Sequence, residues 1–318
     1  MVTAFERYQD EIYVAGAQGT LPALPANLDR LASVAETVMT REAYAYVAGS
    51  AGTEDTAAEN RRAFARWRIV PRMLTDVSNA SYGSTVLGAT LPSPFLLGPV
   101  GVLRIVHADG ESAVARAAAG EGTPMVMSTA ATTSIEEVAA ASGDGQRWYQ
   151  LYWPKNRDVA ASMLARAKAG GFTALVVTLD TRMLAWRPRD LDNGYLPFIR
   201  GLGTQVYMSD PAFQGGLAVP PLEDPLAAFL HYAGMFGDTS LTWPDLPFLR
   251  EHWDGPIVLK GIQSVDDARR AADGGMDGII VSNHGGRQVD GAVGALQPLP
   301  DIAAAVGEQV TVLFDSGI

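Results

Sequence analysis

The feature that most constrains the fold is a regular alternation, from Pro94 onward, of short apolar runs with alanine-rich stretches. The apolar runs have the length of buried strands: Phe95–Leu97, Met125–Met127, Trp148–Leu151, Leu175–Leu179, Ile257–Leu259, Ile279–Val281 and Val310–Phe314. The stretches between most of them read as helices: Glu111–Ala119, Ile135–Ala141, Val159–Ala169 and Val265–Ala272. Apolar strands separated by amphipathic helices indicate a parallel sheet that is covered by helices.

The regular spacing of these runs favours a (β/α)8 TIM barrel, with an open doubly wound sheet as the structural alternative. The last run is followed only by Asp315-Ser316-Gly317-Ile318. An eight-stranded barrel cannot close at that point. The predicted fold class is therefore α/β, a (β/α)8 barrel lacking its last strand region.

Residues 1–94 lack this alternation of apolar runs and helices and precede it in the sequence. Helix signals are Asn27 as a cap before a run to Val38, Thr40 before a run to about Ala48, and the run Glu54–Phe64. Short apolar pieces around Gly88 predict a small hairpin. We expect residues 1–94 to form helices and a hairpin that pack on a barrel made by residues 95–318.

The connection after the fourth apolar run, about 181–244, is far longer than an ordinary loop between a strand and a helix. Among its residues are Gly201, Gly203, Gly215, Gly216 and several prolines. Structureless insertions of this length are commonly lids or disordered segments. We therefore expect a lid-like insertion over about 181–244.

The composition limits the classes of partner. The net charge of -11 disfavours nucleic acid and anionic membranes, and an anionic substrate would need specific arginine or lysine side chains. The absence of cysteine excludes disulfides, thiolate metal sites and a cysteine nucleophile, and no metal site is expected. There is no apolar window of about 18 residues and no signal-like N-terminus, so a cytoplasmic location is the expectation.

Polar side chains follow the apolar runs, at the end of a barrel where chemistry takes place. The residues at these strand ends are Gly98-Pro99, Ser128-Thr129, Gln150, Tyr152, Thr178, Asp180, Lys260, Asn283-His284, Arg287 and Asp315. A single serine or threonine at such a place can simply meet water. When a lysine, an aspartate, a histidine and an arginine all follow strands at the same end of a barrel, they instead indicate an acid–base and anion-binding site.

The most specific string is Val281-Ser282-Asn283-His284-Gly285-Gly286-Arg287-Gln288-Val289-Asp290. Its paired glycines allow a sharp turn that directs His284 and Arg287 to the same place. A lone histidine is commonly structural. A histidine at a strand end, beside two glycines and an arginine, favours catalysis.

This string resembles the signature of the FMN-dependent α-hydroxy-acid oxidase and dehydrogenase family. Further matching segments occur in the family's order: Tyr44-Ala45-Tyr46, Ala58-Glu59-Asn60-Arg61, Pro71-Arg72, Tyr149-Gln150-Leu151-Tyr152, Thr178-Leu179-Asp180-Thr181, Val258-Leu259-Lys260-Gly261 and Phe314-Asp315-Ser316-Gly317. The resemblance covers nearly the whole chain. It implies FMN as the cofactor, a small 2-hydroxy acid as the substrate and a homotetramer as the common family assembly.

The resemblance also implies roles for the acid–base residues. His284 matches the catalytic base, and Asp180 matches the carboxylate that stabilises the base when it is protonated. Tyr152 matches the tyrosine that hydrogen-bonds the substrate oxygen. The structural alternatives are a helix cap for Asp180 and a buried core position for Tyr152.

Three side chains match groups that bind the substrate carboxylate or line the site. Arg287 matches the arginine that pairs with the carboxylate through its planar fork. Tyr46 matches a second carboxylate ligand, and Arg187 matches an active-site arginine.

The cofactor contacts follow from the same resemblance. Lys260 matches the lysine near flavin N1 and O2, where its charge stabilises the reduced ring. The remaining contacts to the ring and ribityl chain are implied for Pro99, Val100, Gly101, Ser128, Gln150, Thr178, Asp315, Ser316 and Gly317.

Ala130 stands where glycolate oxidase has a tryptophan, and in this it resembles lactate oxidases and lactate 2-monooxygenase. The segment Ala185–Asp192 resembles lactate 2-monooxygenase most. This implies oxidation of L-lactate with O2 to acetate, CO2 and water. The alternative is an oxidase or dehydrogenase that yields the 2-oxo acid.

In the family, arginines beyond the point where this sequence stops bind the FMN phosphate. We therefore expect the natural continuation to begin with an arginine and to complete that site, and an inactive truncated fragment without FMN is an alternative. A different FMN barrel enzyme, such as an isomerase or a nucleotide dehydrogenase, is a further alternative. Those enzymes lack the combined set of Tyr46, Tyr152, Asp180, His284 and Arg287.

Overall fold

The computed structural model describes residues 4–318, which form two compact units. The first consists of the residues up to Ala48 together with Ile69–Ser81, and the second of Gly49–Arg68 and Tyr82–Ile318. The helices of the first unit are α1 (Ala4–Ala17), η1 (Leu28–Arg30), α2 (Leu31–Val38) and α3 (Arg41–Ala48). The predicted cap is confirmed, because the Asn27 side chain accepts a hydrogen bond from the Asp29 N–H at 3.0 Å.

The second unit is built on a six-stranded parallel sheet in which each strand pairs with the next one along the chain. The strands are β3 (Met125–Ser128), β4 (Arg147–Leu151), β5 (Leu175–Thr178), β6 (Ile257–Ile262), β7 (Gly278–Val281) and β8 (Thr311–Phe314). Six of the predicted strands are thus confirmed to within three residues at either end. This order is that of a (β/α) barrel wall, in agreement with the predicted class.

The prediction of a regular strand at Phe95–Leu97 is wrong. Only Leu97 joins the sheet, as a single parallel bridge to Met125. Pro94 and Pro99 flank the run, and proline has no N–H to extend a ladder of hydrogen bonds. The segment therefore runs beside β3 without forming a strand.

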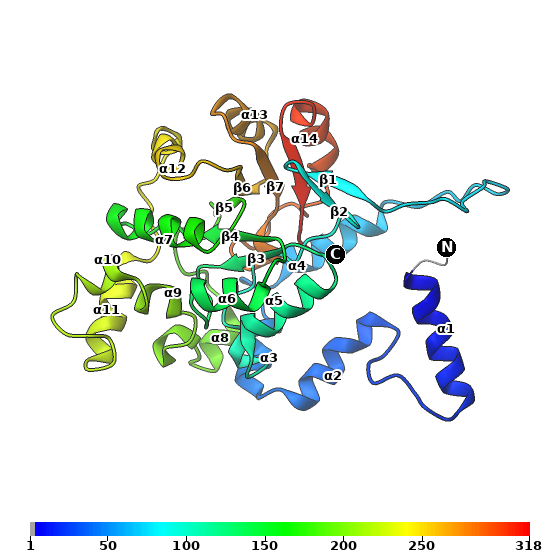
Figure 1. Cartoon of the computed structure of the whole chain (residues 1–318), viewed down its shortest axis with the longest axis horizontal. Coiled ribbons are helices and arrows are strands. Elements are labelled where there is room, and N and C mark those ends of the chain that lie inside the picture. Colours follow the sequence, from blue (N-terminus) through cyan, green and yellow to red (C-terminus); the bar gives the residue numbers. More distant parts are fainter. Residues whose placement is uncertain (1–3) are drawn as a thin grey trace. The chain divides into compact units, whose positions relative to one another are not determined.

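Helices cover the outer face of the sheet, as the alternation in the sequence predicts (Figure 1). They are α5 (Gly110–Gly120), α6 (Ile135–Ser142), α7 (Arg157–Ala169), α12 (Pro247–His252), α13 (Val265–Asp273) and α14 (Leu299–Val306). Ser134 and Glu137 form a capping box that starts α6. Outward residues of the strands pack against these helices in the main core.

Inward residues of the strands form a second core, which the hairpin β1 (Ser84–Val86) and β2 (Ala89–Leu91) helps to fill. The predicted hairpin is confirmed by antiparallel pairing of Val86 with Ala89. Val86 and Leu91 contact inward side chains that include Trp148 and Val176. Two residues further along each strand the inward positions become polar: Ser128, Gln150, Thr178, Lys260, Ser282 and Asp315. The site therefore lies at the carboxyl ends of the strands.

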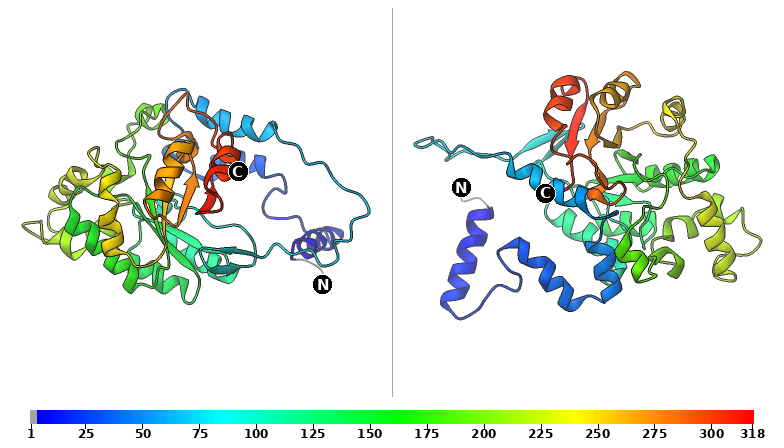
Figure 2. Two further views of the ribbon diagram at one scale, coloured as in Figure 1. Left: turned by 90° about the horizontal axis from the view of Figure 1, so that it is seen from above. Right: turned by 180° about the vertical axis from the view of Figure 1, so that it is seen from behind.

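The connection between β5 and η4 (Trp243–Asp245) is not a structureless loop. It contains α8 (Pro188–Asp192), η3 (Pro197–Arg200), α9 (Gln205–Met208), α10 (Pro211–Gln214) and α11 (Pro225–Met235). Each of α10 and α11 starts with a capping aspartate followed by proline, Asp210-Pro211 and Asp224-Pro225. The helices α9 to α11 gather on the side of this unit opposite α14 (Figures 1 and 2).

Helix α4 (Asp55–Ala65) also belongs to the second unit and packs on the turn η5 (His284–Gly286). It corresponds to the predicted helix Glu54–Phe64. Every helix within residues 4–318 is too short or too polar to span a lipid bilayer.

Candidate active site

The turn that follows β7 holds three consecutive residues in the left-handed region. The φ angles are 58° at His284, 67° at Gly285 and 75° at Gly286. Glycine adopts this conformation readily, whereas histidine does so at a cost that its surroundings must offset. Side-chain oxygens accept hydrogen bonds from the N–H groups of all three residues. Ser282 Oγ accepts from His284 at 3.1 Å, Ser316 Oγ accepts from Gly285 at 3.0 Å, and Asn283 Oδ1 accepts from Gly286 at 3.1 Å.

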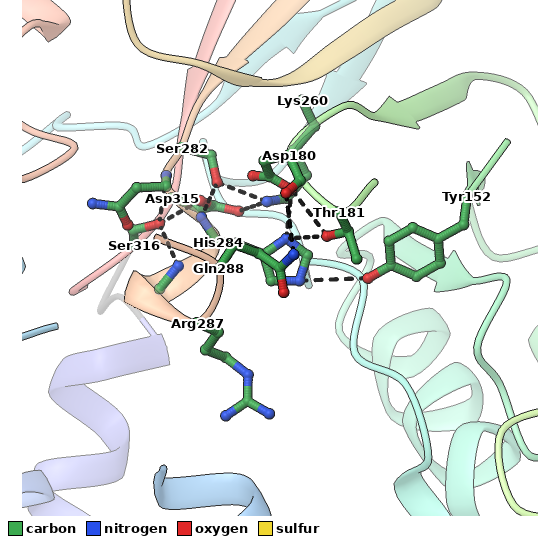
Figure 3. A network of polar contacts seen from close by, with 12 residues as sticks. Tyr152, Asp180, Thr181, Lys260, Ser282, His284, Arg287, Gln288, Asp315 and Ser316 are labelled. Atoms are coloured by element: carbon green, nitrogen blue, oxygen red, sulfur yellow. Dashed lines mark hydrogen bonds and ion pairs between the residues drawn. The ribbon is translucent and has the colours of Figure 1, made fainter. Parts of the chain in front are cut away.

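His284 and Asp180 form the closest acid–base pair of the site (Figure 3). Nδ1 of His284 lies 2.7 Å from Oδ1 of Asp180, and the Thr181 hydroxyl donates to the same carboxylate oxygen at 3.2 Å. On the other side of the ring, Nε2 lies 3.4 Å from the Tyr152 hydroxyl. The carboxylate thus fixes one ring nitrogen, and the other nitrogen faces the tyrosine.

The surroundings of Asp180 keep it ionised. Burial alone would raise the pKa of its carboxyl group, since a charged group loses its hydration there. The hydrogen bond from His284 and the positive charges of His284 and Lys260 outweigh burial, so the pKa of Asp180 is lowered. A negative charge is therefore present beside the imidazole whenever the imidazole takes up a proton.

Lys260, the lysine predicted to contact the cofactor, is buried. It belongs to the polar layer, the group of inward polar residues at the strand ends: Ser128, Gln150, Thr178, Lys260, Ser282 and Asp315. Lys260 Nζ lies 2.7 Å from Ser282 Oγ and 2.9 Å from Asp315 Oδ2. Asp315 Oδ1 in turn accepts a hydrogen bond from the Ser316 hydroxyl at 2.9 Å. The end of β8 is thereby tied both to the lysine of β6 and to the turn that contains His284.

The polar layer also contains buried atoms that suit a flavin ring. Within residues 4–318, Gln150 Nε2 and Thr178 Oγ1 are buried and have no hydrogen-bond partner, while Gln150 Oε1 accepts from Ser128 Oγ at 3.0 Å. Buried polar atoms are rarely left unpaired in folded proteins. The carbonyl and ring-nitrogen atoms of an isoalloxazine supply such partners, and Lys260 supplies a cation.

The loop 98–102 approaches this layer closely. The Val102 N–H donates to the Ala130 carbonyl at 2.9 Å, and a Cβ on Gly101 would lie 2.9 Å from the Ala130 side chain. Only glycine at position 101 permits this approach, which brings Pro99 and Val100 to the same edge of the site. The loop fits the predicted backbone contact with the flavin.

The structure gathers the predicted arginines in one corner. Arg187 Nε donates to the Arg287 carbonyl at 3.0 Å, and Arg287 Nη1 donates to the Gly49 carbonyl at 2.5 Å. The Arg287 side chain extends away from the His284 ring (Figure 3). Tyr46 lies on α3 in the other compact unit, so its place at the site remains a prediction.

Several supporting residues are absent from the set predicted from the sequence. Thr181 binds Asp180, and Gln288 links the Arg187 guanidinium, at 2.9 Å, to the Asp180 carbonyl, at 3.1 Å. Asn60 of α4 and Asn283 exchange two hydrogen bonds of 2.9 and 2.7 Å between their amides. Ser282 and Asn60 both lie in sequence segments that resemble the family. The alternation of inward and outward residues along β7 also indicates that Ser282 points inward.

Comparisons with known proteins agree with this geometry. The FMN-dependent dehydrogenase family matches residues 35–318. An FMN-dependent alpha-hydroxy acid dehydrogenase of Penicillium citrinum is 46% identical, over 99% of this chain and 79% of that protein. An L-lactate oxidase of Lysinibacillus sphaericus is 41% identical, over 95% of this chain and 77% of that protein.

Solved structures give the same result. A crystal structure of a mandelate oxidase is 37% identical and has a TM-score of 0.80, over 93% of this chain and 79% of that one. A lactate oxidase of Pediococcus acidilactici is 30% identical with a TM-score of 0.79, over 93% of this chain and 76% of that one. The chain therefore belongs to the family of FMN-dependent dehydrogenases, as an FMN-dependent α-hydroxy-acid oxidoreductase.

Proposed function

We propose that this enzyme oxidises small L-2-hydroxy acids, with L-lactate as the preferred substrate and O2 as the electron acceptor. The observation that carries the proposal is the placement of His284 between the Asp180 carboxylate at 2.7 Å and the Tyr152 hydroxyl at 3.4 Å. One ring nitrogen is thereby bound to a carboxylate, and the other is directed to a hydroxyl group. This arrangement suits proton removal from an alcohol.

His284 Nδ1 carries the hydrogen of the bond to Asp180, which leaves Nε2 free to accept a proton. In the proposed reaction Nε2 removes the proton of the substrate hydroxyl, and the Tyr152 hydroxyl hydrogen-bonds the same oxygen. Asp180 stabilises the positive charge that His284 then carries. Bound FMN supplies the acceptor for the two electrons that leave the α-carbon.

The substrate carboxylate needs a cationic partner in a chain whose net charge is -11. Arg287 is proposed for this role, with Arg187 beside it and Tyr46 as a second ligand. Arg187 contacts both the Arg287 carbonyl and the Gln288 side chain, so it supports the segment that carries Arg287. The planar fork of an arginine suits two parallel hydrogen bonds to a carboxylate.

We propose that the products of L-lactate oxidation are acetate, CO2 and water, as in lactate 2-monooxygenase. The small Ala130 side chain and the likeness of Ala185–Asp192 to that enzyme support this choice. The second candidate is an oxidase that yields pyruvate and hydrogen peroxide. The L-lactate oxidases among the relatives favour it.

The test uses the holoenzyme and separates the two half-reactions. Anaerobic addition of L-lactate should bleach the flavin absorbance near about 450 nm, and D-lactate should leave it unchanged. The products formed in air then decide the acceptor chemistry, since one O2 yields either acetate with CO2 and water or pyruvate with hydrogen peroxide. If glycolate, lactate and mandelate all fail to bleach the flavin, the proposed function is wrong.

A further inference from the structure

Gly261 forms a bulge in β6, directly after the buried lysine. Lys260 pairs with Ile280 and Ile262 pairs with Val281, so Gly261 is an extra residue between two successive pairs. Its φ of +105° is one that L side chains rarely adopt. Bulges of this kind redirect neighbouring groups and are common beside active sites.

The missing side chain of Gly261 faces the catalytic carboxylate. A Cβ at this position would lie 2.9 Å from Asp180 Oδ2 and 3.0 Å from Asp180 Cγ. Carbon and oxygen atoms without a bond between them repel strongly at such distances. Asp180 can hold its present place only while residue 261 has no side chain.

The two oxygens of Asp180 are held in different ways. Oδ1 accepts hydrogen bonds from His284 at 2.7 Å and from Thr181 at 3.2 Å. Oδ2 is buried and has no hydrogen-bond partner in the part of the chain that the structure describes. Oδ2 faces the place that a side chain of residue 261 would occupy, 2.9 Å from where its Cβ would lie.

The backbone around Gly261 has little freedom to yield to a new methyl group. On one side the Leu179 N–H donates to the Lys260 carbonyl at 2.9 Å, and on the other the Ser282 N–H donates to the Ile262 carbonyl at 3.4 Å. Asp180, in contrast, lines a cavity of about 340 Å3 together with Gly261. A methyl group would therefore displace the Asp180 carboxylate toward this cavity.

We propose that Gly261 is a positioning residue for the oxidation, since the absence of its side chain lets the Asp180 carboxylate reach His284 Nδ1. This inference rests on the proposed roles of His284 as base and Asp180 as its charge partner. Gly261 acts through Asp180 and needs no contact of its own with the substrate.

The first test examines the hydrogen bond itself in the FMN-bound enzyme. A proton between a histidine nitrogen and a carboxylate gives a low-field proton NMR signal, which Asp180→Asn should remove and thereby assign. The signal should also be lost in Gly261→Ala. It should persist in Gly275→Ala, a matched control in which φ is +74° and no atom lies within 4 Å of the added Cβ. Retention of the signal in Gly261→Ala would overturn the proposal.

The second test measures the rate of anaerobic flavin reduction by L-lactate. Gly261→Ala should lower this rate about 10²-fold, the effect expected when a catalytic group moves by about 1 Å. Adding Gly261→Ala to an Asp180→Ala enzyme should change the rate by less than about threefold, because the displaced carboxylate is no longer there. Equal losses in both backgrounds would show that Gly261 acts independently of Asp180.

The same set of variants, Gly261→Ala, Asp180→Ala and their combination, also tests the proposal through stability. If Gly261→Ala is destabilised, its loss of unfolding free energy should be smaller in the Asp180→Ala background, because the backbone strain at residue 261 is common to both backgrounds and only the clash with Asp180 is removed. Equal destabilisation in both backgrounds contradicts the proposal. If the wild-type flavin is not reduced by any 2-hydroxy acid, the proposed function fails. The NMR comparison still decides whether Gly261 holds Asp180 against His284.

Discussion

Lys260 and Ser282 are joined by a buried contact of 2.7 Å between Nζ and Oγ, and the same Oγ accepts the His284 N–H at 3.1 Å. One hydroxyl therefore links the lysine proposed to face the flavin with the backbone of the proposed base. Ser282 is completely buried, so water does not replace either contact. Lys260 and the backbone of His284 thus share one hydroxyl group.

We predict that Ser282→Ala slows flavin reduction about tenfold and destabilises the fold by about 1–3 kcal/mol, because a buried lysine and a buried N–H lose a partner. The rate follows from stopped-flow reduction by L-lactate, and the stability from denaturant unfolding. Ser142→Ala is the control, since Ser142 is also buried and its hydroxyl donates to the Val138 carbonyl on α6 at 2.9 Å. Equal reduction rates in the two variants would remove Ser282 from the support of the site.

We predict that His284→Gln lowers turnover with L-lactate by about 10²–10⁴-fold, the usual contribution of a general base. FMN content should remain that of the wild type, because the predicted ring contacts come from other residues. His252→Gln serves as the control, as His252 contacts the Phe248 carbonyl on α12. Turnover of His284→Gln within about threefold of wild type would exclude the proposed role.

Much of the fold could be predicted because each buried strand is a continuous apolar run followed by a polar residue. The bulge at Gly261 could not, since it depends on pairing with β7. The failure of Phe95–Leu97 to form a strand did have a local signal, because Pro94 and Pro99 flank that run. The helices of the insertion have local signals in Asp210-Pro211 and Asp224-Pro225. Their number was hidden by the surrounding glycines and prolines, which read as a loop.

The pairing of His284 with Asp180 was predictable in part, because each residue follows the end of a strand and parallel strands bring their ends together. The left-handed turn at His284–Gly286 was not, since the N–H groups of Asn283 and Gly285 on either side of His284 bind Ser316, a side chain from the end of a different strand. The direction of Arg287 toward Gly49 likewise depends on a segment 238 positions away. Such contacts arise only once the strands are assembled.

We predict that Arg287→Lys raises the KM for L-lactate about tenfold and also slows flavin reduction, although the charge is retained. An ammonium group cannot form the two parallel hydrogen bonds of a guanidinium, and it cannot keep the contact with the Gly49 carbonyl at the same time. Arg269→Lys, at an exposed position of α13, is the control. An unchanged KM and reduction rate in Arg287→Lys would show that the carboxylate is bound elsewhere.

The last prediction concerns Asp290, which ties the loop after η5 to the start of α4. Its carboxylate accepts from the Thr53 hydroxyl at 2.7 Å, the Thr53 N–H at 2.6 Å and the Thr56 N–H at 3.2 Å. These hydrogen bonds, that of the Thr53 side chain first, lower the pKa of Asp290 to about 2. An unfolded chain has an aspartate pKa near about 3.9.

A carboxyl group with a lowered pKa in the folded state stabilises the fold above its unfolded pKa, and this stability is lost as the pH falls through the folded pKa. Asp290→Asn should therefore lower the urea midpoint by a constant amount between pH 7 and about pH 4, and the gap to wild type should narrow from about pH 4 toward about pH 2. The exposed Asp273→Asn at the end of α13 controls for loss of a charge alone. A gap that stays the same at pH 6 and at about pH 3 would show that the hydrogen bonds to Thr53 do not depend on the Asp290 charge.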